Sequence, residues 1–449
     1  MKKILILFLL IFTAYAEDRP NILFILTDDQ RFDNLSCYGN KFFKTPHIDA
    51  LAKKGAKFNN AFVTTSICAA SRASIFTGMV ESSHGFTFGK PALKEVNMLN
   101  SYPALLKKAG YKTGFTGKFG VKMAKNREMI GKMFDVFKPI WGYMKKQKDG
   151  SFKHETEISG DNACKMMEEF KGSPFCISVS FNATHAHDGN HKPGFGHFPW
   201  PKAVDNMYRD VKFPEPKLDN EEYFKTLPEL MRNKDTSMNR FRYYWRWDTK
   251  DKYQKNMQGY ARMTSGIDHV VGKMVKKLET LGLLDKTIII YTADNGYFMG
   301  NRGFAGKWCH FEESLRIPLV IKLPKGKVVN SNKMVLNIDL TATMIDLAGL
   351  ELPAQYQGRS LKPLLEGKDV KWRDSFFCEH QMNNPRIPKW EGVRTERFIY
   401  AYYYEKKYEF FHDLQKDPLQ KTNMIKDETY KKQIEELKKK LKEYKKQYQ

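Results

Sequence analysis

Asn21-Ile22-Leu23-Phe24-Ile25-Leu26, followed at once by Thr27-Asp28-Asp29, is the stretch that decides the fold. An unbroken apolar run of this length predicts a strand buried on both faces, as in a parallel sheet covered by helices. Three more runs end in the same way: Tyr111–Thr116 before Gly117-Lys118, Phe175–Phe181 before His185, and Thr287–Thr292 before Asp294-Asn295. Because ligands of such sheets bind beyond the carboxyl ends of the strands, we expect these four ends to build one composite site.

The remaining pattern predicts a large α/β unit followed by a smaller one. Helical stretches separate the apolar runs, at Ile48–Lys54, Ser71–Thr77, Tyr102–Ala109, Asn162–Lys171 and Gly259–Leu281. A connector rich in Pro and Gly, Glu351–Lys371, leads to strand-like stretches at Ser375–Glu379, Phe398–Tyr404 and Tyr408–His412 and to a charged helix from Thr429. We therefore predict an N-terminal domain over residues 17–350, which carries the composite site, and a C-terminal domain over residues 351–449.

Residues 1–16 have the pattern of a secretion signal. Lys2 and Lys3 precede an apolar run, Ile4–Phe12, that is too short to span a bilayer, and Ala14-Tyr15-Ala16 offers small residues for a cut before Glu17. A short membrane anchor is the alternative. No later stretch has transmembrane length, so we predict an exported, periplasmic or secreted protein without stable membrane insertion.

Net charge and cysteine content exclude few functions. The 449 residues carry a formal net charge of +24, which would attract polyanions. Much of the excess lies in the Lys-rich tail after Lys421, where a solvated helix face is the simpler explanation. The charge is compatible with an acidic substrate, and we predict no nucleic-acid partner. The six cysteines lack the spacing of a zinc site or a disulfide-dense scaffold, although one or two disulfides can form outside the cytoplasm.

Four of the strand-end residues are hard oxygen ligands. Asp28, Asp29, Asp294 and Asn295 suit Ca²⁺, or less well Mg²⁺, and do not suit zinc or copper. Calcium tolerates the irregular set that adjacent acidic residues provide. Taken alone, Asp294-Asn295-Gly296 is better explained as a turn.

A specific motif changes that balance. Ser66-Ile67-Cys68-Ala69-Ala70-Ser71-Arg72, closed by Thr77-Gly78, resembles the signature of the sulfatase family. In that family the motif directs oxidation of the cysteine to formylglycine, so the resemblance implies a formylglycine-generating maturation enzyme as a partner of this chain. A buried structural cysteine is the bland alternative. It does not explain the Ser-Arg and Thr-Gly pairs at matching spacing.

The resemblance extends over nearly the whole mature chain. Further matching segments are Pro20–Gln30, Thr45–Ala52, Thr116–Lys118, Thr292–Gly296, Lys307–Pro318 and Tyr408–Asn423. It implies an α/β fold like that of alkaline phosphatase, a mostly parallel sheet sandwiched by helices. It also implies a smaller C-terminal α+β domain on a short antiparallel sheet.

The resemblance also implies roles for single residues. Formylglycine at position 68 would hydrate to a diol, one hydroxyl of which, made acidic by calcium, attacks the sulfur of a sulfate ester. Arg72 would orient that diol, and Lys118 and Lys307 would hold the sulfate oxygens. His185 would protonate the leaving alcohol or bind the sulfate. Gly120 departs from the family pattern, since it stands where a histidine usually helps to deprotonate the diol; His187 or His310 could compensate.

The substrate is less constrained than the reaction. We expect a sulfated carbohydrate, namely polysaccharide fragments, with His310, His380 and Arg386 as candidate substrate-binding residues. An aryl or alkyl sulfate, and a phosphonate or phosphodiester, are the alternatives among enzymes. A non-catalytic glycan-binding protein is suggested by Gly120 alone, and the intact motif from Cys68 to Arg72 argues against it.

Overall fold

The computed structural model describes residues 19–189 and 196–448, so the predicted signal peptide over residues 1–16 lies outside the described residues. Within them, a central sheet has nine strands in the order β11-β2-β12-β8-β1-β7-β3-β4, with β13 beside β2. Its strands are β1 (Asn21–Thr27), β2 (Ala56–Phe62), β3 (Lys112–Gly117), β4 (Val136–Pro139), β7 (Phe175–Ser180), β8 (Thr287–Ala293), β11 (Arg316–Ile317), β12 (Leu319–Lys322) and β13 (Val329–Leu336).

The four strands that the apolar runs predict are neighbours in this sheet. β1 pairs in parallel with β7 on one side and with β8 on the other, and β7 pairs in parallel with β3. Leu26 lies opposite Ser180 and Thr292, so the carboxyl ends of the strands meet at one edge. The prediction of a mostly parallel sheet is confirmed, and the four predicted strand ends lie at one edge of it.

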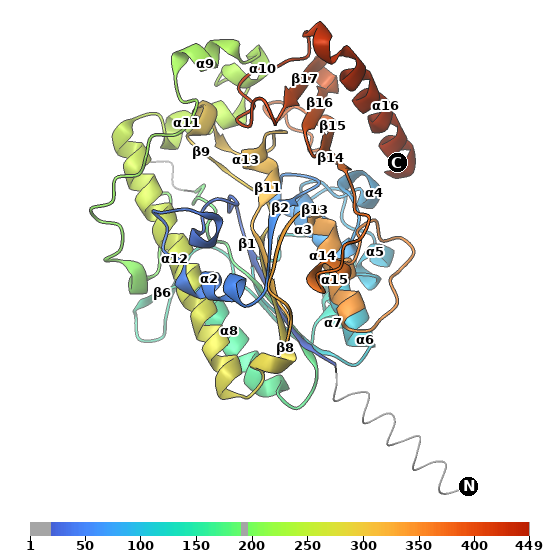
Figure 1. Ribbon diagram of the computed structural model, residues 1–449. Coiled ribbons are helices and arrows are strands. Elements are labelled where there is room, and N and C mark those ends of the chain that lie inside the picture. The colour runs from blue at the N-terminus through green and yellow to red at the C-terminus, as the bar shows by residue number, and fades with distance from the viewer. Residues whose placement is uncertain (1–18, 190–195, 449) are drawn as a thin grey trace, which may run out of the picture.

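Helices cover both faces of the sheet (Figure 1). One face carries α2 (Pro46–Lys53), α8 (Glu155–Phe170) and α12 (Lys250–Thr280), and the other carries α3 (Cys68–Thr77), α6 (Tyr102–Lys108) and α14 (Asn337–Leu347). Alternate residues of β1 serve the two cores. Leu23 and Ile25 pack with the α8 and α12 side chains, whereas Ile22, Phe24 and Leu26 pack on the opposite side. Burial on both faces explains why the run is apolar without alternation.

Shorter elements complete the large unit and the loops around the site. The helices are α4 (Glu81–His84), α5 (Glu95–Leu99), α7 (Asn126–Met133), α9 (Glu221–Thr226), α10 (Glu229–Arg232), α11 (Met238–Arg246), α13 (Glu312–Leu315) and α15 (Lys362–Leu365). The strands form two small hairpins, β5 (Met144–Lys146) with β6 (Phe152–His154) and β9 (Phe298–Met299) with β10 (Ala305–Gly306).

A second sheet is antiparallel and follows the first along the chain. Its order is β14 (Ser375–His380), β15 (Trp390–Thr395), β16 (Phe398–Tyr403) and β17 (Tyr408–Asp413), and α16 (Lys431–Tyr448) packs beside it (Figure 1). The predicted C-terminal α+β unit is confirmed as part of the fold class, and its boundary at residue 350 stays a prediction. All six cysteines are free thiols.

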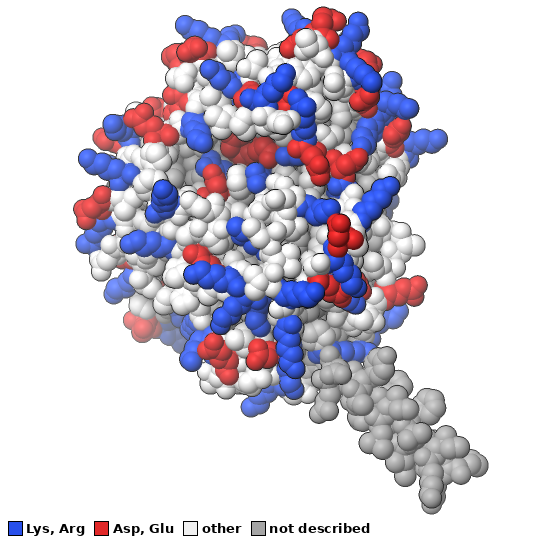
Figure 2. All heavy atoms as spheres, viewed as in Figure 1, with Lys and Arg blue, Asp and Glu red and all other residues white. Residues whose placement is uncertain are grey.

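The helices and the surface charge bear on the predictions about membrane insertion and polyanion binding. No helix among residues 19–189 and 196–448 is long and apolar enough to cross a bilayer. Figure 2 shows lysine and arginine side chains spread over the visible face with acidic ones between them, rather than gathered in one basic stripe.

Candidate active site

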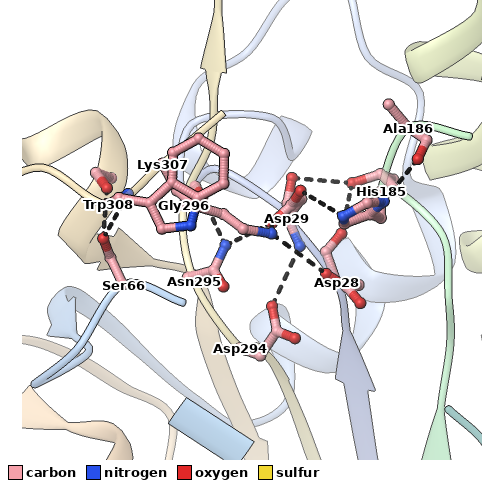
Figure 3. Close-up of polar contacts among 12 residues, drawn as sticks. Asp28, Asp29, Ser66, His185, Ala186, Asp294, Asn295, Gly296, Lys307 and Trp308 are labelled. Carbon is pink, nitrogen blue, oxygen red and sulfur yellow. Dashed lines mark hydrogen bonds and ion pairs between the residues drawn. The ribbon is translucent and has the colours of Figure 1, made fainter. Parts of the chain in front are cut away.

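The ends of four parallel strands bring the predicted residues together. Asp28 and Asp29 follow β1, Lys118 follows β3, and Asp294 follows β8. His185 lies in the loop after β7, with its Nε2 3.6 Å from Oδ2 of Asp29. Figure 3 shows Asp28, Asp29, Asp294, Asn295, His185 and Lys307 around one point. Asn295 and the three aspartates are buried, so the aspartate charges interact at low dielectric.

Cys68 and Arg72 come from the first turns of α3. Cys68 is the first residue of the helix, and Arg72 lies one turn further on. The Arg72 guanidinium donates from Nε to Oδ2 of Asp294 at 2.8 Å, pairs with Asp28 at 3.4 Å and donates to the carbonyl oxygen of Lys118 at 2.7 Å. It also donates to the Ser180 hydroxyl, and a buried guanidinium with four acceptors is held in one orientation, so Arg72 fixes the helix against both aspartates.

Two lysines complete the cluster. Lys118 forms an ion pair with Oδ2 of Asp28, and Lys307 forms one with Oδ1 of Asp29. Burial alone would raise the pKa of Asp28, but the charges of Lys118, His185 and Arg72 outweigh it and hold that pKa well below its usual range. The carboxylate is therefore ionised at neutral pH.

The thiol at position 68 is a weak nucleophile in this environment. Burial raises the pKa of Cys68, although the charges of Lys118 and Lys307 act in the opposite direction. A thiol with a raised pKa stays neutral near pH 7, and the neutral thiol reacts slowly. An unmodified Cys68 is thus poorly suited to attack an ester.

The oxygen atoms of the cluster fit a hard cation. Asp28 Oδ1, Asp29 Oδ2 and Asn295 Oδ1 are buried and have no hydrogen-bond partner. One ligand atom each from Asp28, Asp29 and His185 lie within 4.8 Å of one another. Asp294 differs, since its Oδ1 accepts from the Asp29 amide at 3.2 Å and its Oδ2 from Arg72. Buried, unpartnered oxygens are costly unless something binds them, and this donor set suits Ca²⁺ or Mg²⁺.

His185 presents one ring nitrogen to the cluster. Its Nδ1 lies 2.6 Å from the carbonyl oxygen of Ala186, which can only accept, so Nδ1 carries a proton and Nε2 faces Asp29. Burial lowers the pKa of His185, although the charge of Asp29 acts to raise it.

Comparison with known proteins identifies the family that has this arrangement. A sulfatase family model matches residues 20–350, and a model described as N-sulphoglucosamine sulphohydrolase, C-terminal, matches residues 300–447. The chain belongs to the sulfatase family. It is a sulfuric ester hydrolase.

Individual relatives are similar over most of their length. The chain is 29% identical to an N-acetylglucosamine-6-O-sulfatase of Bacteroides thetaiotaomicron, over 96% of this chain and 87% of that one. It is 29% identical to an arylsulfatase of Clostridium perfringens, over 94% and 93%. A solved structure in complex with its substrate D-glucosamine-2-N,6-O-disulfate superposes with a TM-score of 0.78 at 27% identity, over 96% and 98%.

Gly120 of this sulfatase occupies a position that only glycine fills well. Its φ is +72°, and a Cβ there would lie 2.8 Å from Cδ of Arg72. A histidine would therefore strain the backbone and displace the arginine that spans both aspartates. His187 is exposed and packs against Tyr143, and His310 is fully buried elsewhere.

Two of the three residues predicted to bind substrate are fully buried. His310 contacts the Tyr403 hydroxyl at 2.9 Å and the His412 ring at 3.2 Å, beneath the second sheet. His380 lies in β14 with no exposed surface. Both side chains are enclosed by protein in this conformation, and their substrate-binding roles stay predictions. Arg386, half-buried over the Phe241 ring, stays a prediction.

Sequence reasoning missed a second charged group beside His185. Asp188 accepts from Nη2 of Arg242 at 2.9 Å and from Nη2 of Arg246 at 2.5 Å, and its Oδ2 lies 4.0 Å from Nε2 of His185. The Arg242 guanidinium also lies over the Trp308 ring, next to Lys307. The mixture of basic and aromatic residues in 240–247 was the available signal, but it gave no indication of which acid they would meet.

Proposed function

We propose that this sulfatase removes a sulfate ester from a sulfated amino sugar, such as a 6-O-sulfated glucosamine at the end of a polysaccharide fragment. The observation that carries the proposal is the buried cluster in which Arg72, Lys118 and Lys307 surround Cys68 and three ionisable aspartates. The relative named N-acetylglucosamine-6-O-sulfatase and the structure holding D-glucosamine-2-N,6-O-disulfate support the amino-sugar part. The arylsulfatase relative keeps an aryl sulfate as the alternative.

The proposal includes formylglycine made from Cys68 and calcium held by Asp28, Asp29, Asp294 and Asn295. When present, the cation supplies Lewis-acid charge, and the aldehyde supplies, after hydration, hydroxyl groups in place of a neutral thiol. Export and maturation by a formylglycine-generating enzyme are part of the same proposal.

The chain's own residues have distinct tasks in the reaction. Lys118 and Lys307 hold positive charge where the sulfate oxygens gain negative charge, and burial makes that charge effective. Arg72 keeps residue 68 and both aspartates in one arrangement. His185 holds its ring through Nδ1–H, and in its imidazolium form it carries a second proton on Nε2 for the leaving oxygen.

Mass spectrometry and a substrate panel test the proposal. The protein is produced with a formylglycine-generating system, and the Cys68 peptide is analysed for an aldehyde that a hydrazine reagent traps. Turnover is then compared for N-acetylglucosamine 6-sulfate, 4-nitrophenyl sulfate and a phenylphosphonate monoester, with Cys68→Ala as the control. We expect an aldehyde and the highest kcat/KM for the sulfated sugar. An unmodified thiol despite an active maturase contradicts the mechanism, and a preference for either other substrate contradicts the substrate class.

A further inference from the structure

The β5–β6 hairpin exposes large apolar side chains beside the active site. Trp141 precedes the hairpin and is 67% exposed, Phe152 is 63% exposed, and Met144 is 43% exposed. In the register of the hairpin, Lys146 lies opposite Phe152 and Met144 lies opposite His154, so Met144, Lys146 and Phe152 share one face. Large exposed apolar patches often mark a binding surface, whereas apolar side chains exposed singly need no explanation.

Three hydrogen bonds tie this segment to the catalytic strand ends. The Ile140 amide, one residue before Trp141, donates to the carbonyl oxygen of Gly117 at 2.9 Å, directly before the catalytic Lys118. The Ile140 carbonyl accepts from the side chain of Asn182 at 3.3 Å. On the other side of Trp141, the Tyr143 hydroxyl donates to the carbonyl oxygen of His185 at 2.8 Å. Trp141 therefore lies on a segment held at both ends by the loops that carry Lys118 and His185.

The charge of the segment is strongly positive. Residues 136–154 contain the acid Asp149 and five lysines, Lys138, Lys145, Lys146, Lys148 and Lys153. Lys153 forms an ion pair with Asp161, and Asp149 accepts hydrogen bonds from Ser151, so these two are engaged locally. Lys146 and Lys148 are exposed. Aromatic faces next to free ammonium groups complement a ligand with apolar C–H faces and negative charges.

We propose that Trp141, Met144, Phe152, Lys146 and Lys148, here called the hairpin platform, bind the sugar residues that adjoin the sulfated residue in the active site. The inference rests on the proposed function, since it takes a sulfated oligosaccharide as the ligand. Trp141 and Phe152 stack on sugar rings, and the two lysines pair with sulfate groups along the chain. The platform makes the enzyme prefer oligosaccharides over single sulfated sugars.

Kinetics of a double variant test this specificity. Trp141→Ala combined with Phe152→Ala is compared with wild type on a heparin-derived hexasaccharide and on N-acetylglucosamine 6-sulfate. We expect KM for the hexasaccharide to rise about tenfold, the equivalent of about 1.4 kcal/mol, with kcat unchanged and both constants for the monosaccharide unchanged. Phe88→Ala is the matched control, because Phe88 is 54% exposed but lies between α4 and α5, across the molecule from β6 (Figure 1). An equal KM for the hexasaccharide in variant and wild type overturns the proposal.

Binding without catalysis separates this inference from the proposed function. In a Cys68→Ala background, calorimetry with the same hexasaccharide should show a Kd about tenfold weaker for the double variant. Lys146→Gln with Lys148→Gln should flatten the dependence of Kd on salt. If wild type hydrolyses no sulfated sugar, the proposed function fails while the Kd comparison still decides the platform. Unchanged glycan binding with lost binding to phosphatidylglycerol vesicles would assign the platform to a membrane surface and overturn the proposal.

Discussion

Two groups of buried carboxylates in this sulfatase have different charges around them. The catalytic group, Asp28, Asp29 and Asp294, lies at the ends of β1 and β8 with Arg72 and two lysines around it. The acid pair, Glu81 of α4 and Glu379 of β14, lies where the second sheet meets the first unit. Both groups are buried, so burial alone does not explain their difference.

The carboxylates of the acid pair accept hydrogen bonds from neutral groups, whereas those of the catalytic group contact cations. Thr65 donates to Oε2 of Glu81 at 2.7 Å, and the Ser82 amide donates to Oε1 of Glu379 at 2.8 Å. Burial raises the pKa of Glu379 to about 7, and burial with the charge of Glu379 raises the pKa of Glu81 well above its usual range. Glu81 is therefore protonated at pH 7 and Glu379 is about half protonated, whereas Asp28 is ionised.

Nearby opposite charge, and not burial, distinguishes Asp28 from the acid pair. Desolvation penalises every buried carboxylate, and it costs several kcal/mol, on the order of 3 or more, unless an opposite charge lies close. Cations keep Asp28 ionised and able to bind a metal ion, whereas burial and the charge of Asp28 raise the pKa of Asp294 to about 6. The acid pair has no such cation among the causes of its pKa shifts, so both pKa values are raised, and the hydrogen bond from Ser82 to Glu379 joins two parts of the chain.

Removing a cation from the catalytic group should have the largest effect. We expect Lys307→Met to lower kcat/KM for a sulfate ester by about 10²–10³, because one buried charge that faces the sulfate oxygens is lost. Steady-state kinetics measure this, with the Cys68 modification checked by mass spectrometry in the same preparation. Glu81→Gln is the control, since it alters the other carboxylate group, and it should leave kcat/KM within twofold, about 0.4 kcal/mol. Equal losses in both variants would show that the two groups are not distinct.

The acid pair should contribute to the pH dependence of stability. A glutamate of the unfolded chain releases its proton near pH 4.5, whereas folded Glu379 keeps it to about pH 7. Folded Glu379 therefore binds more proton between these values, and its contribution to the free energy of unfolding falls by about 3 kcal/mol as the pH rises from 4.5 to 7. Urea unfolding at several pH values measures this fall. Glu379→Gln should flatten it, and an unchanged slope would mean that Glu379 is already ionised in the folded protein.

Calcium should stabilise the protein through the catalytic group alone. A ligand at one hundred times its Kd stabilises the folded state by about 2.7 kcal/mol, so we expect calcium to raise the Tm by a few degrees and EDTA to reverse the rise. Asp28→Asn should remove the calcium response, because Asp28 supplies a buried oxygen without a hydrogen-bond partner. Glu81→Gln should keep it. A calcium response that survives in Asp28→Asn would place the ion elsewhere.

Most residues of the catalytic group could be predicted from the sequence, whereas the contact between Glu81 and Glu379 could not. Asp28 and Lys118 were predictable because each follows an apolar run, and parallel strands bring such ends together. Strand β2 was missed, since its half-polar sequence Ala56–Phe62 lacks both an apolar run and a clean alternation. Helix α12 begins at Lys250, nine residues before the predicted start at Gly259, because its first turns are polar. Glu81 and Glu379 are nearly 300 residues apart, and no local pattern reports such a tertiary contact.

One glycine lies near each carboxylate group, and alanine substitutions at the two positions can be compared directly. Gly120 and Gly85 have nearly the same φ, +72° and +70°, so alanine costs each backbone about 1 kcal/mol. A Cβ at Gly120 would lie 2.8 Å from Cδ of Arg72. A Cβ at Gly85, the residue directly after α4, would meet nothing within 4 Å. We expect both variants to lower the Tm by a few degrees.

Only Gly120→Ala should also lower kcat, by about tenfold, equivalent to about 1.4 kcal/mol, because Arg72 must move away from Asp28 and Asp294 to make room. Thermal unfolding and steady-state kinetics on the two variants separate the shared backbone cost from the displacement of Arg72. If Gly120→Ala keeps the wild-type kcat, the guanidinium tolerates movement and its contacts with the aspartates are structural. If Gly85→Ala loses kcat as well, the acid pair is coupled to the catalytic group through α4 and the segment that leads to Cys68.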